Sequence, residues 1–227
     1  MDANAKQKSE KAGERRLTLL EVVDALIEAG KVPRAEAEKF RQERRYFRGA
    51  AHPISVIAEQ RWKSPEPPHR LLDLETLTEW LAGWVGLQYY HIDPLKVNLA
   101  AVTDVMSSAY ASRFRILPVE VRATEVVIAT AEPYIRGWED ELKPILKKDI
   151  RLVIANPEDI ARYQVEFYNL AKSVKGALAR GDVARTGISN FEQLVELGKG
   201  KASLDANDQH IVSIVDWLWQ YAFEQRA

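Results

Sequence analysis

The first periodic run of apolar residues in the chain begins at Leu19. Leu19, Val23 and Leu26 recur at the spacing of one helix face, and Gly30 stands where the chain would turn out of that helix. The preceding residues are polar and charged and show no periodicity, so they cannot offset the entropy of ordering. We therefore expect a disordered arm over residues 1–18 and a helix after it.

Two more helices complete a helical unit that we expect over residues 19–62. One, from about Arg34 to Phe47, is dense in charge and has a narrow apolar face, and the other begins near Pro53 and runs to Trp62. Prolines then dominate the segment from Lys63 to Pro68, where they remove backbone donors and restrict the residues before them. This composition predicts a boundary between the helical unit and the domain that follows it.

The clearest helical pattern lies after that boundary. Asp73 is placed to cap a helix, Leu77 and Leu81 lie on its apolar face, and Gly86 ends it. Short runs rich in β-branched and aromatic residues follow, alternating with further helical patterns. We expect strands at residues 87–92, 115–120, 125–129 and 150–154, and helices at 99–113, 138–146 and 159–172.

This order predicts an α+β protein, in which a small α/β domain over residues 69–172 follows the helical unit. The strands at 115–120 and 125–129 are joined by a short polar loop, so we expect them to be antiparallel, with helices packed on the sheet. Residues 173–206 are expected to be a linker that contains a short helix over about 190–197. A helix with one apolar face is expected over 207–227.

Charge and composition narrow the classes of partner. Lysine and arginine number 32 against 33 aspartates and glutamates, so no net positive field attracts nucleic acid or anionic lipid. Cysteine is absent, which excludes disulfides and thiolate sites and favours the cytoplasm. No run approaches the roughly 20 apolar residues of a membrane span. We therefore expect contact with a membrane only through another protein.

The sequence lacks the motifs of a phosphate loop and of a histidine metal site. Gly200-Lys201 lacks the earlier glycine and the following serine or threonine of a phosphate loop. No two of the four histidines have the helical spacing at which they share a metal; they are His52, His69, His91 and His210. We expect no catalytic residue and no metal site in these 227 residues.

Several short motifs occur together in one order along the chain. They lie at Gly86–Leu95, Arg113–Val119, Ala129–Pro133 and Ile154–Ile160. Together they resemble the N-terminal domain of type II secretion and type IV pilus assembly ATPases, over roughly residues 69–172. The sequence does not distinguish a secretion motor from a pilus motor.

The resemblance implies a role that the composition does not. Family members are hexameric motors, and their N-terminal domain docks on the cytoplasmic part of an inner-membrane platform protein. In the family a helix like residues 207–227 leads into the catalytic portion, which binds ATP and Mg²⁺, so we expect these residues to be a non-catalytic docking or regulatory region. We expect it at the cytoplasmic side of the bacterial inner membrane, held there by its partner. The sequence allows two interpretations of four tryptophans: they contact the partner protein, or they pack in the core. They are Trp62, Trp80, Trp84 and Trp138.

Cyclic di-GMP sensing is the alternative function. In some relatives the helical unit binds this nucleotide through a motif that begins with arginine, leucine and glycine. Aligned on Gly30, Leu26 fits the apolar pattern, but Glu21 stands where the arginine should be and would repel phosphate. Arg15 or Arg16 supplies the arginine only if an insertion is allowed. A purely structural helical hairpin is the competing interpretation.

Overall fold

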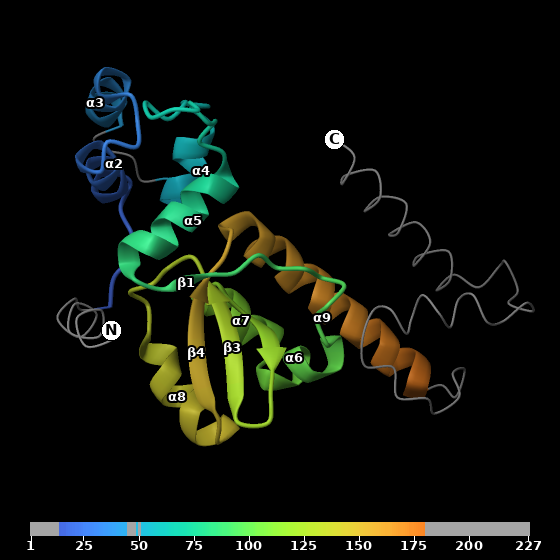
Figure 1. Ribbon diagram of the computed structural model, residues 1–227. Helices are drawn as coiled ribbons and strands as arrows, with labels where there is room; N and C mark the ends of the chain where they lie inside the picture. Colours follow the sequence, from blue (N-terminus) through green and yellow to red (C-terminus); the bar gives the residue numbers. More distant parts are fainter. Residues whose placement is uncertain (1–13, 45–48, 50, 180–227) are drawn as a thin grey trace, which may run out of the picture.

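The computed structural model describes residues 14–44, 49 and 51–179 of the chain (Figure 1). Its first part is helical, and the ends of the helices follow the expected signals. Thr18 caps α2 by accepting a hydrogen bond from the backbone of Glu21 at 3.2 Å, and Gly30 leaves the helix with φ +63°. The helices are α2 (Leu19–Glu28), α3 (Arg34–Glu43), α4 (Pro53–Ala58) and α5 (Leu74–Val85).

A mixed four-stranded sheet forms the second part, in the order β1-β4-β3-β2. Strands β2 and β3 are antiparallel, as predicted, whereas β4 runs parallel to both β3 and β1. β1 is shorter than the expected strand at 87–92, because only two of its residues pair with β4. The strands are β1 (Gln88–Tyr89), β2 (Ile116–Val121), β3 (Glu125–Thr130) and β4 (Asp149–Ile154).

Helices cover both faces of this sheet. Alternate strand residues face opposite ways, so Val127 packs beneath α6 and α9 while Ile128 packs with α8. The fully buried Trp138 anchors α8 in the second of these cores. These helices are α6 (Leu99–Val105), α7 (Ser108–Phe114), α8 (Gly137–Leu146) and α9 (Pro157–Ala179). The α+β fold is therefore confirmed.

Several of the expected helices have different bounds, and the one expected from about Arg34 to Phe47 ends at Glu43. The helix expected at 99–113 is divided into α6 and α7, because Met106 is extended and Ser107 caps α7 through its hydroxyl. Helix α4 ends at Ala58 rather than at Trp62, because the chain turns there into a loop that Lys63 and Leu71 close by pairing as an antiparallel bridge.

Helix α5 packs in a core different from the expected one. The sequence pattern predicts it in the α/β domain, but Leu77 and Leu81 are buried with Val22 and Leu26 of α2. Figure 1 shows α2, α4 and α5 together at the end of the sheet where β3 and β4 finish. The helical unit therefore extends to Val85.

The outer boundaries also differ from those expected. Leu17, assigned to the disordered arm, is 5% exposed and belongs to the helical core. Helix α9 continues to Ala179, past the linker boundary expected at 173. The rest of that linker, the short helix at 190–197 and the helix at 207–227 lie outside the described residues. Within the described part, no helix is both long and apolar enough to cross a membrane.

Candidate docking site

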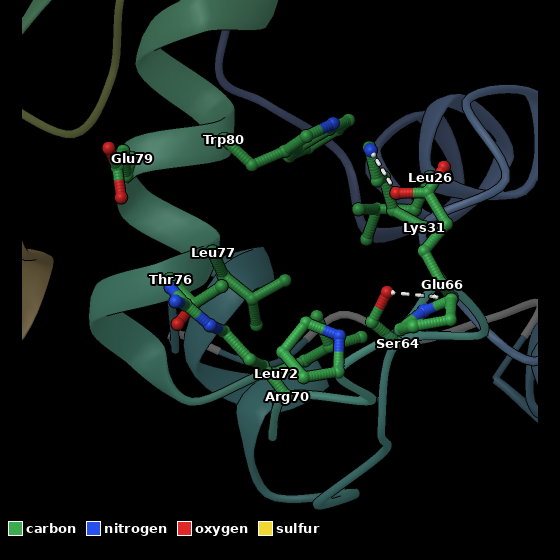
Figure 2. Close-up of a pocket in the computed structure, with 12 residues that line it drawn as sticks. Leu26, Lys31, Ser64, Glu66, Arg70, Leu72, Thr76, Leu77, Glu79 and Trp80 are labelled. Atoms are coloured by element: carbon green, nitrogen blue, oxygen red, sulfur yellow. Dashed lines mark hydrogen bonds and ion pairs between the residues drawn. The ribbon is translucent and has the colours of Figure 1, made fainter.

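A pocket of about 380 Å³ opens in the helical unit between α2, α5 and the loop at residues 63–71 (Figure 2). Leu26 and Leu77 belong to its floor, and the side chain of Trp80 points across it toward Lys31. Pockets that take small ligands have volumes of about 300–1,000 Å³ and mainly apolar walls. The space is therefore large enough for one bulky side chain.

Trp80 forms a stacked pair with Trp84, one helical turn further along α5. Their ring centroids are 5.4 Å apart and their planes differ by 11°. Both side chains pack on the edge of the helical core and remain only partly buried. The pair therefore presents an aromatic surface next to the pocket.

The other two tryptophans that we considered as contacts are core residues. Trp62 is 7% exposed and lies edge-on against Phe40, with ring centroids 5.3 Å apart. Trp138 is fully buried and donates its indole N–H to the carbonyl of Ile135 at 2.7 Å. The structure therefore leaves Trp80 and Trp84 as the accessible aromatic contacts among the four.

Charged groups surround the apolar floor of the pocket. The ammonium of Lys31 forms an ion pair with Glu66 at 2.8 Å, which ties the end of α2 to the loop at 63–71. Arg70 lies on the opposite side of the pocket, near Thr76 (Figure 2). Within the described part of the chain, the guanidinium of Arg70 has no hydrogen bond or ion pair. Neither cation was singled out from the sequence.

The helix that carries this surface is fastened to the sheet by the carboxylate of Glu75. That carboxylate accepts hydrogen bonds from the hydroxyl of Tyr89 and from Nδ1 of His91, the latter at 3.0 Å. Burial by itself would raise the pKa of Glu75, but the hydrogen bonds that it accepts lower it below its ordinary value. Glu75 therefore stays ionised as the junction between α5 and the end of β1.

A second junction joins the N-terminal segment to the loop between β3 and α8. The backbone N–H of Leu17 donates to the buried carboxylate of Glu132 at 3.0 Å, and the N–H of Gly137 donates to Glu14 at 2.9 Å. Burial raises the pKa of Glu132, although the Leu17 N–H and the charges of Arg16 and Arg115 oppose that rise. Residues 14–17 are therefore tied to the sheet rather than free of it.

The four candidate residues for cyclic di-GMP lie toward the two ends of α2. Arg15 donates two hydrogen bonds of 2.6 Å to Glu21, lies over the ring of Tyr134 at 4.4 Å from its centroid, and has a raised pKa because of that carboxylate. Arg16 is exposed nearby. Leu26 and Gly30 lie toward the other end of α2, about 10 Å or more along the helix axis.

The histidines form no metal cluster with other ligands in the described ranges, and His210 lies outside them. His52 is buried, with Nε2 donating to the carbonyl of Ala131 at 3.0 Å and Nδ1 accepting from the N–H of Ile54 at 3.4 Å. Burial lowers the pKa of His52 to about 4. His52 is therefore a neutral core group that holds α4 against the end of β3.

Comparison with known proteins finds similarity over part of the chain. Residues 85–174 match the model of the MshEN domain. The type IV pilus assembly ATPase TfpB of Acinetobacter baylyi (strain ATCC 33305 / BD413 / ADP1) is 38% identical over 177 residues, which are 78% of this chain and 30% of that protein. The chain therefore spans less than a third of the length of this relative.

Two solved structures show a likeness to this chain. The structure of MshE with cdg covers 67% of this chain and 100% of its own, with 18% identity and a TM-score of 0.46. The structure of the N-terminal domain of XpsE covers 68% of this chain and 99% of its own, with 16% identity and a TM-score of 0.37.

The resemblance predicted from the motifs at 86–95, 113–119, 129–133 and 154–160 is confirmed by the matched family model and the pilus ATPase. The pocket and the Trp80–Trp84 pair precede the matched residues, so they lie on the helical unit beside that domain. Residues 85–174 match the family model of the MshEN domain, and over 177 residues the chain is similar to a type IV pilus assembly ATPase.

Proposed function

We propose that this chain is a non-catalytic docking region of a pilus assembly or protein secretion ATPase and that it binds the cytoplasmic part of an inner-membrane platform protein. The observation that carries the proposal is the accessible Trp80–Trp84 pair beside a pocket in the helical unit. Tryptophan and arginine are the residues that most often dominate binding energy at protein interfaces. In this role the region lies at the cytoplasmic side of the membrane, held there by its partner.

The way in which the helical unit is fastened supports a docking role. Contacts at two places hold it to the sheet: Glu75 on α5 with Tyr89 and His91, and Glu132 with the backbone of Leu17. A partner that binds α5 therefore also holds the α/β domain and whatever follows α9. We propose that ATP and Mg²⁺ bind in a part of the whole hexameric motor other than these 227 residues.

Binding to the partner tests this proposal directly. The purified chain is titrated by calorimetry with the cytoplasmic domain of the platform protein encoded in the same genome. Trp80→Ala and Trp84→Ala are each expected to weaken binding by about 30-fold, as hot-spot truncations of about 2 kcal/mol do. The matched control is Ile145→Ala on α8, which removes another exposed apolar side chain, 72% exposed, and is expected to leave binding unchanged.

Two results would contradict the proposal. One is that the platform domain does not bind the chain at any concentration reached. The other is that Ile145→Ala weakens binding as much as the tryptophan variants do. Both tryptophans are only partly buried, so we expect the alanine variants to keep the fold. Circular dichroism of each variant checks this.

Cyclic di-GMP sensing is the second candidate, supported by one feature of the structure. The guanidinium of Arg15 is held over the ring of Tyr134 at the surface, an arrangement that a guanine base or phosphate could join. Its two hydrogen bonds to Glu21 compete with any phosphate. Titration with cyclic di-GMP, with Arg15→Ala as the comparison, decides between the two, and a flat trace for the unaltered chain removes this candidate.

A further inference from the structure

The ion pair between Lys31 and Glu66 is weak enough to be exchanged. Its N–O distance is 2.8 Å, but the two side chains are 40% and 62% exposed. Exposed pairs of this kind contribute little to stability, because water solvates both partners almost as well when they are separated. A carboxylate brought by another molecule can therefore replace Glu66 at the Lys31 ammonium at little cost.

Two cations and two carboxylates line the pocket, and their positions favour a negatively charged group next to Lys31. Glu66 is already bound to Lys31, and Glu79 lies on the side of α5 away from Lys31 (Figure 2). Arg70 stands at the rim, and its guanidinium binds no other group in the described residues. Two cations therefore face an incoming group, one of them uncommitted and the other only loosely paired.

The walls between these cations are apolar. Leu72 and Leu77 lie between Lys31 and Arg70, and Trp80 closes the side formed by α5 (Figure 2). A large apolar side chain would displace water from these walls, and an aromatic ring would also gain from stacking beside Trp80. The volume of about 380 Å³ accommodates one such side chain.

We propose that the pocket binds a protein partner through a large apolar side chain that stands next to a carboxylate, and that this carboxylate takes the Lys31 ammonium from Glu66. The proposal rests on the docking function above and states the chemistry of the partner at that site. A basic group next to Lys31 is disfavoured, because it would have to approach the Lys31 ammonium. The complementarity of charge thus selects an acidic, apolar segment.

Three small probes test this chemistry on the full chain. They are acetyl-Asp-Trp-amide, acetyl-Asn-Trp-amide and acetyl-Lys-Trp-amide, which differ only in the charge beside the indole. Nuclear magnetic resonance shifts of Leu26, Leu77 and the Trp80 indole N–H report binding. We expect the aspartyl probe to bind about threefold or more tightly than the asparaginyl probe and the lysyl probe to bind weakest, as one exposed charge contact allows. Equal affinities, or shifts away from the pocket, would overturn the proposal.

Charge variants locate the contact. Glu66→Gln frees Lys31 and is expected to tighten binding of the aspartyl probe by about two- to fivefold, whereas Lys31→Gln is expected to abolish the preference for it. The control is Lys39→Gln, which removes another exposed, paired lysine from the helical unit and is expected to change nothing. A preference for the aspartyl probe that survives Lys31→Gln would show that Lys31 does not select the carboxylate.

The same measurements separate the possible outcomes. If the platform domain binds at Trp80 while the probes show no charge preference, this inference fails and the docking function stands. If the probes discriminate while no platform domain binds, the docking function fails and the chemistry of the pocket stands. The segment Asp216-Trp217 of this chain has the stated chemistry. If Trp217→Ala strengthens probe binding by more than about threefold, the chain itself occupies the pocket, and the proposal of a separate partner is overturned.

Discussion

The side-chain amide of Asn156 donates a hydrogen bond of 3.2 Å to the carboxylate of Glu75, 81 residues earlier in the chain. The amide oxygen of the same Asn156 accepts from the backbone N–H of Glu158 at 2.9 Å, in the first turn of α9. One side chain therefore satisfies a backbone donor at the start of α9 and at the same time binds α5. Helix α5, which carries Trp80 and Trp84, and helix α9, which overlaps the end of the residues that match the MshEN model, are joined by one hydrogen-bonded pair.

The first prediction concerns that pair. Glu75→Gln keeps the size of the side chain but removes the charge that accepts from Tyr89, His91 and Asn156. We expect the free energy of unfolding to fall by about 1–2 kcal/mol, because hydrogen bonds to a charged acceptor are stronger than neutral ones. Urea unfolding measures the loss. Hydrogen exchange of the first-turn amides of α9 is expected to quicken as well.

The matched control is Glu79→Gln on the exposed side of the same helix. The lowered pKa of Glu75 gives a second readout. An acid whose pKa is lower in the folded state contributes stability above its ordinary pKa and loses it as the pH falls through the lowered value. Glu75→Gln should therefore reduce stability at pH 7 more than at pH 3. A loss of the same size at both pH values would contradict the assigned role of the carboxylate.

The second prediction concerns the dependence of stability on pH that the buried His52 produces. Burial lowers its pKa from 6.5 to about 4, and the charged form would also place a proton on Nδ1, which accepts from the N–H of Ile54. A base with a lowered folded pKa contributes stability above its ordinary pKa, and that stability is lost as the pH falls from about 6.5 to about 4. The contribution is at most about 3.5 kcal/mol, at about 1.4 kcal/mol for each pKa unit.

Ring-proton resonances of His52, followed from pH 7.5 to pH 3.5, measure this directly. A midpoint near 4 is the expected result, and a midpoint above 6 would exclude the buried, neutral state. Glu132 has the opposite effect on stability: burial raises its pKa, so its contribution to stability increases as the pH falls. The stability of the unaltered protein should therefore be compared with that of Glu132→Gln. In that variant the fall of stability with acid is expected to be steeper.

Replacing glycine by alanine is expected to have opposite effects on stability at two positions of the helical unit. Gly83 lies inside α5, and nothing stands within 4 Å of the position of an added Cβ, so Gly83→Ala should stabilise the protein by about 0.5–1 kcal/mol. Gly30 has equal space but φ +63°, so Gly30→Ala should destabilise it by about 1–2 kcal/mol. Thermal unfolding of the two variants is the measurement, and a shift of the same sign in both would contradict the backbone geometry.

Signals close together in the sequence predicted local structure well. Asp73 caps α5 by accepting from the N–H of Thr76 at 2.8 Å, and Gly86 ends the helix in the left-handed conformation, both as expected. The core that α5 joins was not predictable, because its apolar face fits equally well against a sheet or against another helix. That choice depends on Leu77 meeting Leu26, residues far apart in the sequence.

The candidate site shows the same division between local and long-range information. The sequence identified Trp80 and Trp84 as possible contacts, but it gave Trp62 and Trp138 equal standing, because the burial of one tryptophan is decided by its tertiary neighbours. The pair Lys31–Glu66 joins residues 35 positions apart, and Glu66 belongs to the proline segment at which we expected a boundary. No local pattern marks such a pair.

The N-terminal segment provides the last prediction, because there the structure and the sequence pattern disagree most. Leu17 is 5% exposed in the helical core, and its N–H donates to Glu132, although the pattern predicted a disordered arm through residue 18. Leu17→Ala is therefore expected to lower the free energy of unfolding by about 2–3 kcal/mol, near the lower end of the range for buried leucines, because a segment outside the helices can relax around the cavity. Thr18→Ala, which removes only the cap of α2, is expected to lower it by about 1 kcal/mol. If Leu17→Ala instead leaves urea unfolding unchanged while Thr18→Ala has its effect, the chain becomes ordered only at α2, and the junction between Leu17 and Glu132 does not hold the helical unit to the sheet.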